Sequence, residues 1–143
     1  MTYKQTAIEV LLSRIEQDQT TDSRVKGLIL AHLPKVEGQF SKGVAYNIDI
    51  QALAIAQMLN ELQWQGIIQM SVVVEQLGTE AAMDKAIEAL ELTTSATPPQ
   101  RKDGQPKTAG GVFLMLTKRD YWAGMKARAK AFKAAMQVQA VVA

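Results

Sequence analysis

Two stretches near the start of the chain repeat apolar residues every three or four positions. The first contains Ile8, Leu11, Leu12 and Ile15, and the second contains Val25, Leu28, Ile29 and Leu33. This spacing aligns apolar side chains along one face of a helix, so it predicts two amphipathic helices. The polar cluster at 20–22 separates them, either Asp22 or Ser23 can cap the second helix, and Pro34 ends it.

The stretch 35–47 has no sustained period and contains two glycines, which predicts a loop. We expect an N-terminal helical hairpin and linker over 1–47 and a helical domain over 48–143, the two forming one compact unit. Helical spacing returns after the loop, and either Asn47 or Asp49 can cap the new helix. Its apolar face contains Ile55, Met58, Leu59 and Leu62.

Residues 66–78, with the sequence GIIQMSVVVEQLG, fit two kinds of secondary structure. The three consecutive valines at 72–74 suit a buried strand. Apolar positions 67, 70, 74 and 77 instead fit a helix closed by Gly78, and no neighbouring segment offers a partner strand. We therefore predict a helix here. A further helix follows, with Thr79 as its cap, and its apolar face contains Met83, Ala86, Ile87 and Leu90.

The C-terminal third begins with a segment, 93–109, that holds three of the four prolines together with Ser, Thr, Asp and Gly. This composition predicts a long mobile loop. The run VFLML at 112–116 is apolar on all sides, as expected of a short helix in a core. A final amphipathic helix contains Trp122, Met125, Ala129, Phe132 and Met136. The predicted fold is all-α, an irregular bundle of about seven helices.

Composition narrows the possible chemistry. The chain has 143 residues, 48% apolar and 21% charged, which suits one folded domain. No apolar run is long enough for a membrane span or a secretory signal, so we expect a cytoplasmic protein without a membrane partner. Cysteine is absent and His32 is the only histidine, so we expect no metal site, no cofactor and no catalysis by thiolate or triad. His32 is expected near a helix C-terminus, interacting with free carbonyl groups.

Charge is distributed unevenly along the chain. The segment 101–133 contains nine basic and two acidic side chains, a balance of +7, and the net charge of +2 leaves −5 for all other residues. A segment with so many cations is typical of a protein that binds an anionic partner.

Gly110 and Gly111 stand directly before the apolar run, with Lys107 and Lys118 on either side. Glycines at a helix N-terminus leave the backbone N–H groups sterically bare, and these groups and the helix dipole attract anions such as phosphate. The glycines also suit a second purpose, since they let the loop turn tightly into a buried helix.

The last helix places three lysines along one stripe beside an aromatic residue. At about 100° per residue, Lys126, Lys130 and Lys133 border the apolar face at Trp122, and Arg128 falls on the opposite flank. Single-stranded nucleic acid needs such a surface, because lysines pair with phosphates and bases stack on rings. The alternative is an ordinary solvated helix face, since Ala, Lys and Arg are strong helix formers.

The segment Lys107 to Lys118, KTAGGVFLMLTK, resembles the most recognisable motif of the RNA-binding domain of the phosphorylated adaptor for RNA export. The upstream stretches IAQMLNEL and DKAIEALELT are similar to its preceding helices, so the resemblance covers about 48–118. It implies a small all-helical domain that binds single-stranded RNA. It also implies loop contacts to RNA from Arg101, Lys102, Lys107, Thr108, Gly110 and Gly111, and core packing by Val112, Phe113, Leu114 and Leu116.

The motif and the charge pattern together predict a protein that binds single-stranded or small structured RNA with little sequence specificity. The predicted contacts are Arg101, Lys102, Lys107, Thr108, Gly110, Gly111, Lys118, Arg119, Trp122, Lys126, Lys130 and Lys133. The alternative is a helical adaptor, or a homodimer, that uses the aliphatic N-terminal helices between 8 and 33. A phosphate-handling enzyme is disfavoured, because no Walker-type lysine follows the glycines and no general base is evident.

Overall fold

The computed structural model describes residues 5–142, and the side chains of residues 5–138. Within that part of the chain the protein consists of helices joined by loops and contains no strand, which confirms the predicted all-α class. The elements are α1 (Ala7–Gln17), α2 (Ser23–His32), the 3₁₀ turn η1 (Leu33–Val36), α3 (Lys42–Asn47), α4 (Ala52–Leu59), α5 (Trp64–Leu77), α6 (Thr79–Thr93), α7 (Ala109–Leu116) and α8 (Lys118–Val142).

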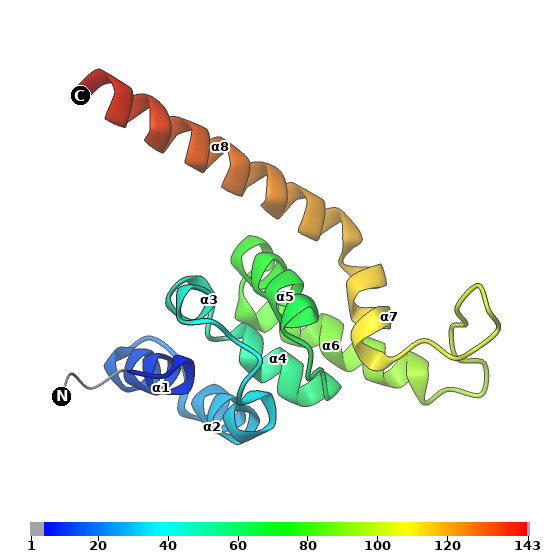
Figure 1. The fold of residues 1–143 in the computed structure, drawn as a ribbon. Helices are drawn as coiled ribbons and strands as arrows, with labels where there is room; N and C mark the ends of the chain where they lie inside the picture. The colour runs from blue at the N-terminus through cyan, green and yellow to red at the C-terminus, as the bar shows by residue number, and fades with distance from the viewer. Residues whose placement is uncertain (1–4, 143) are drawn as a thin grey trace.

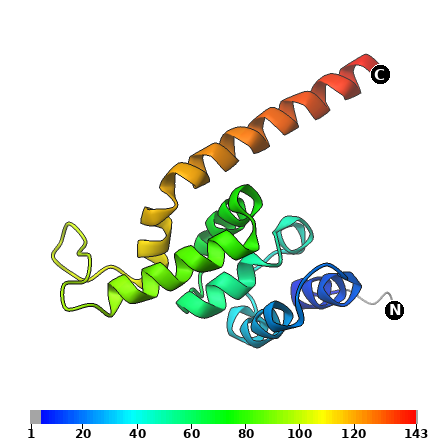
Figure 2. The same ribbon diagram turned by 180° about the vertical axis from the view of Figure 1, so that it is seen from behind.

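Helix α4 lies at the centre of the molecule, because its residues 52–56 are all buried. Helices α2, α5, α6 and α7 pack around it, and α1 packs on α3 at one side. Figures 1 and 2 show α8 leaving this body as a long helix whose far end lies well apart from α1 and α2. The buried apolar residues form one cluster that runs along the chain from Val10 to Phe113.

The segment with the three valines is helical. Helix α5 buries all three, together with Ile67 and Met70. Gly78 closes α5 with a φ of 86°, a left-handed value that residues with a Cβ rarely adopt. The helix prediction for this segment is therefore confirmed.

The stretch 35–47 differs from its prediction as a loop. It contains the end of η1 and the short helix α3, which raise the number of α-helices in the described chain to eight. Ser41 caps α3 by accepting a hydrogen bond from the Val44 N–H at 3.2 Å, and Ala45 is fully buried. A single turn with one buried alanine is too short to give a periodic pattern, so the sequence signal was the cap alone.

Two helix limits also differ from prediction. Helix α4 begins at Ala52 and ends before Asn60, whose left-handed backbone turns the chain, so Leu62 lies outside it and neither Asn47 nor Asp49 caps it. Thr79 is the first residue of α6 and its N-cap is Gly78. The predicted cap of α2 is correct, because the Asp22 carboxylate accepts from the Arg24 N–H at 2.7 Å.

Helix α2 ends at His32, as Pro34 predicts, although the residue between them stays helical. Leu33 has φ −54° and ψ −46°, and it continues into η1 with Pro34 at the start of that turn. No helix in the described residues combines the length and apolar character that crossing a membrane requires.

Phe113 is the largest side chain among those that are fully buried. Replacing it with alanine removes most of a ring and leaves a cavity between α7 and the helices around it. We expect Phe113→Ala to lower the free energy of unfolding by about 3–5 kcal/mol in chemical denaturation. Met115→Ala, on the exposed side of the same helix, is the control and should change this free energy far less.

Candidate nucleic-acid interface

The first turn of α7 is capped from within the protein. The Thr108 hydroxyl accepts a hydrogen bond from the Gly111 N–H at 3.1 Å. Gly110 is buried, and Gly111 is half-buried. The two glycine amides that were predicted to bind phosphate therefore lie at a covered helix end, one of them already bonded.

A carboxylate of the protein itself lies beside Gly110. A Cβ atom at this position would come within 2.7 Å of Oε2 of Glu61, and one at Gly66 within 2.9 Å of its Cδ. Oε1 of Glu61 accepts from the Gln63 N–H at 3.0 Å. This carboxylate thus lies between the first turns of α5 and α7, where the positive ends of the two helix dipoles favour a negative charge.

The close approach favours a small residue at position 110. A Cβ atom there would require the end of the Glu61 side chain to shift, and Cε of Met70 lies 3.5 Å away. Of the two interpretations of the glycine pair, tight entry into a buried helix is the one this geometry supports. The motif residues Gly110 and Gly111 consequently position α7, while the cations around them are left to contact a ligand.

His32 holds the other side of the same turn. Its Nε2 donates to the backbone carbonyl of Glu61 at 2.8 Å, and its Nδ1 lies 3.1 Å from Oε1 of Gln57. His32 is the last residue of α2 and contacts a carbonyl group, but that carbonyl belongs to the turn after α4. Burial is the main cause that lowers the pKa of His32, against the effect of these two hydrogen bonds.

The loop between α6 and α7 folds back on itself. Gln100 and Pro106 form an isolated antiparallel bridge, and the Arg101 N–H donates to the Gln105 carbonyl at 2.7 Å. Gly104 closes the turn with a φ of 84°. The loop therefore presents Lys102 at an exposed tip.

Helix α8 is held to the body by one small residue and one ion pair. At Gly124 a Cβ atom would lie 2.5 Å from Cγ1 of Val72, so α8 and α5 are in close contact there. One turn later Arg128 donates to both carboxylate oxygens of Glu75, from Nε at 2.9 Å and from Nη2 at 2.8 Å. These contacts fix which face of α8 points at the body.

The predicted lysine stripe lies on the opposite face of α8. Lys126, Lys130 and Lys133 are exposed, and none of them forms an ion pair with any described side chain. Trp122 is 55% exposed one turn before Lys126 and meets the ring of Tyr121 edge-on, with centroids 5.3 Å apart. The stripe thus combines unpaired cations with an accessible aromatic face.

Further exposed residues lie before this stripe along the chain, at the start of α8 and on α7. Lys118 and Arg119 are exposed at the start of α8, and Met115 is 42% exposed on α7. The opposite side of the two helices is buried at Val112, Phe113, Thr117 and Gly124. We name the exposed side the α7/α8 face, formed by Thr108, Gly111, Met115, Lys118, Arg119, Trp122, Lys126, Lys130 and Lys133.

The predicted contacts thus fall into two groups along one path. The loop group contains Arg101, Lys102 and Lys107, and Arg101 forms an ion pair with Asp103 at 3.3 Å. The second group lies on α8, and α7 separates the two (Figure 1). A ligand that touches both groups has to be long and extended, as a nucleic acid strand is.

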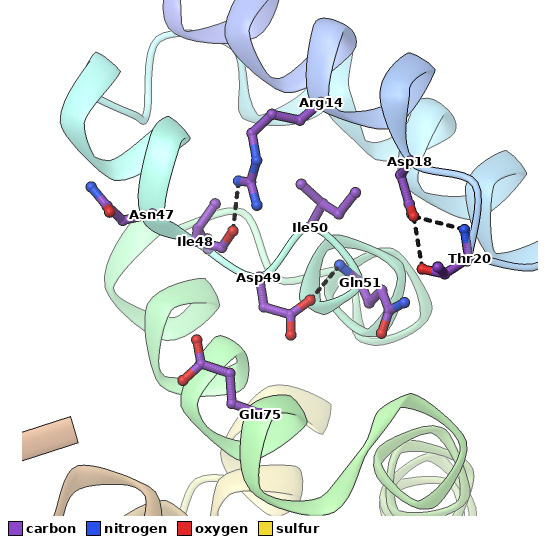
Figure 3. Close-up of a pocket in the computed structure, with 9 residues that line it drawn as sticks. All are labelled: Arg14, Asp18, Thr20, Asn47, Ile48, Asp49, Ile50, Gln51 and Glu75. Atoms are coloured by element: carbon purple, nitrogen blue, oxygen red, sulfur yellow. Dashed lines mark hydrogen bonds between the residues drawn. The ribbon is translucent and has the colours of Figure 1, made fainter. Parts of the chain in front are cut away.

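A polar pocket of about 440 Å³ lies elsewhere, between α1, α5 and the segment that joins α3 to α4 (Figure 3). Arg14 donates from Nη1 to the carbonyls of Ala45 at 2.8 Å and Ile48 at 2.6 Å. The Asp49 carboxylate accepts from the Gln51 N–H at 3.0 Å, and burial raises its pKa. These groups tie chain segments together.

Asp18, on the rim of this pocket, has a similar structural role. It accepts from the Thr21 hydroxyl and from both the N–H and the hydroxyl of Thr20, and these bonds lower its pKa to about 2. In the described part of the chain, no three His, Cys, Asp or Glu side chains are grouped so that they could hold a metal ion.

Sequence reasoning missed three residues on which this interface depends: Glu61, Glu75 and Gly124. Each of them contacts a residue distant in the chain, so the local spacing of residues could not predict these contacts. A faint signal did exist, since Gly66, Gly110 and Gly124 are glycines inside otherwise helical patterns, which often mark a close approach.

Comparison with known proteins gives no match: no family model fits the chain, and no curated protein and no solved structure is similar to it. The resemblance to the RNA-export adaptor domain therefore stays a prediction that rests on the motif at 107–118.

The buried His32 predicts a pH-dependent stability. Because its folded pKa is lowered, the unfolded chain binds the proton more readily, starting near the ordinary value of about 6.5. Stability should be highest above that pH and fall as the pH drops toward the folded pKa, by at most about 1.4 kcal/mol per pH unit. Urea denaturation between pH 5 and 7.5 measures this dependence of stability on pH. The comparison protein is His32→Gln, which keeps a hydrogen-bond donor but cannot titrate. An equal slope in both proteins contradicts the role given to His32.

Proposed function

We propose that this protein binds single-stranded or small structured RNA, with little sequence specificity, along the α7/α8 face. The observation that carries the proposal is the row of lysines at 126, 130 and 133, unpaired among the described side chains, on the exposed side of α8. Among the described residues only Lys85, Arg101 and Arg128 form ion pairs, so what sets these three lysines apart is that they lie together on one helix face. A polyanion satisfies them and releases its own counterions in doing so.

The aromatic and sulfur-containing side chains on the same face support a nucleic acid over other polyanions. Trp122 lies between the lysines of α8 and the loop group, where an unpaired base can stack on it. Met115 adds an apolar surface one helix earlier. Neither contact reads a base edge by hydrogen bonding, so the expected binding is tolerant of sequence.

The loop group supplies the second part of the proposed contact. Lys102 and Lys107 form no ion pair with a described residue, and the turn at 101–104 presents the first of them to solvent. RNA that follows the α7/α8 face reaches this loop at the N-terminal end of α7. In this arrangement Gly110 and Gly111 serve by positioning α7, and they need not touch phosphate.

A helical adaptor without nucleic-acid binding is the alternative function. The observation in its favour is the exposed apolar part of α8, where Phe132 is 70% exposed. That surface lies beside the lysines, but an adaptor function does not explain why the lysines are clustered. RNA binding explains them, so it remains the proposal.

Salt dependence tests the proposal. We expect the wild-type chain to bind a labelled single strand with a slope of log affinity against log salt that corresponds to about four to six phosphates, at roughly −0.7 each. Lys130→Glu with Lys133→Glu should weaken binding and reduce the slope by about 1.4. Fluorescence anisotropy over a salt series measures both quantities.

The matched control is Lys35→Glu with Lys42→Glu, which makes the same change in net charge at two other exposed lysines without a described ion pair, on η1 and α3. This control should bind nearly as the wild type does, since any loss comes from long-range charge alone. The proposal is wrong if the wild type fails to bind at low salt, or if the control weakens binding as much as the α8 variant.

A further inference from the structure

Helix α8 carries an apolar surface that the body leaves uncovered. Met125, Phe132 and Met136 follow each other at helical spacing, and Phe132 and Met136 are 70% and 51% exposed. They lie on the flank between the lysines and the face that packs on α5. A row of large apolar side chains on a projecting helix indicates a partner.

A groove of matching character lies on the other side of the body, between α2 and α6. Both helices pack on α4, and the space between them measures about 580 Å³. Thr79 donates through its hydroxyl to Oε1 of Gln51, whose Nε2 donates to the Thr21 hydroxyl at 2.9 Å, so one glutamine bridges both walls. The apolar side chains that line the groove are Val25, Leu28, Met83 and Ile87.

The groove has an acidic wall. Glu80 and Asp84 lie on its α6 side, and Asp22 and Arg24 lie on its α2 side. None of these four side chains forms an ion pair with a described residue. The two carboxylates of α6, one helical turn apart, therefore lie beside the apolar floor of the groove without a neutralising cation.

We propose that the groove between α2 and α6 binds the second half of α8 from another copy of this chain. The apolar row of α8 fills the apolar floor, and the lysines on one flank of that row face the carboxylates on the α6 wall. The lysines lie on one flank of the apolar row, and the carboxylates lie on the α6 wall of the groove. The helix therefore has one favoured orientation in the groove. Complementary charge of this kind fixes register and excludes the wrong partner.

The molecule's own α8 does not supply this contact. It packs mainly on α5 and α7, and Figures 1 and 2 both show its far end pointing away from α2. Pairing of α8 with a second α8 is disfavoured, because the helix has six basic side chains and Asp120 as its only acid among residues 118–138. Like charges would then lie side by side.

If each of two copies places its α8 in the groove of the other, the dimer contains this contact twice. This closes the assembly as a dimer and brings its buried area toward the roughly 1,200–2,000 Å² of stable interfaces. The inference does not rest on RNA binding, because its evidence is the apolar row and the groove. Both contacts use the lysines of α8, so RNA and a second copy compete for them.

A mixing experiment with two variants tests the dimer in nuclease-treated protein. Ile87→Lys blocks the groove and Phe132→Ser removes the main apolar side chain of the helix, and both positions are exposed, so the fold should be kept. We expect the wild type to form a dimer, and each variant to raise the dissociation constant by about tenfold or more. Mixed together, the variants should form a heterodimer through the one intact groove and the one intact helix. Sedimentation velocity over a concentration series measures these masses.

Leu30→Lys is the matched control, because Leu30 and Ile87 are both 46% exposed but Leu30 does not line the groove. It should dimerise as the wild type does. A monomeric wild type overturns the inference, as does an Ile87→Lys variant that still dimerises fully or a mixture that forms no heterodimer. None of these results would contradict RNA binding by the α7/α8 face.

Discussion

The structure depends on the placement of one carboxylate, that of Glu61, between the first turns of two helices. Its side chain accepts from the Gln63 N–H next to α5 and abuts Gly110 in α7, while its backbone carbonyl accepts from buried His32 at the end of α2. Three helices thus meet at a single residue. Since amides at a helix start attract anions, a carboxylate of the protein beside this turn disfavours an external phosphate there.

This constraint decides which surface is left for a ligand. The exposed cations that flank α7 along the chain are those of the loop and of α8. Gly124 against Val72 and the pair between Arg128 and Glu75 turn α8 so that its lysines face solvent. The same rotation leaves the apolar row of α8 uncovered, so the proposed RNA face and the proposed dimer contact follow from one packing arrangement.

Most of the helices and the lysine stripe of the candidate site could be predicted from the sequence. The features that could not be predicted are short elements or contacts between residues distant in the chain. Periodic apolar residues identified six of the helices, including α5 despite its valines, and the continuous apolar run at 112–116 identified α7. The lysine spacing identified the stripe on α8. Helix α3 escaped because one turn has no period, and the α4 limit shifted because Asn60 adopts a left-handed backbone. The partner of Gly110 could not be predicted, because Glu61 lies about fifty residues earlier and local spacing gives no information on such distant contacts.

We propose that RNA lies along the exposed side of α7 and α8, and not at the glycine end of α7, where Thr108 and Glu61 already lie. The most direct measurement is ultraviolet crosslinking of the full chain to a labelled single strand, followed by mass spectrometry of the crosslinked peptides. The account predicts crosslinks at Trp122 and in the neighbouring peptides of α8 and the loop. Crosslinks confined to α1 through α6, or none above background, would contradict it.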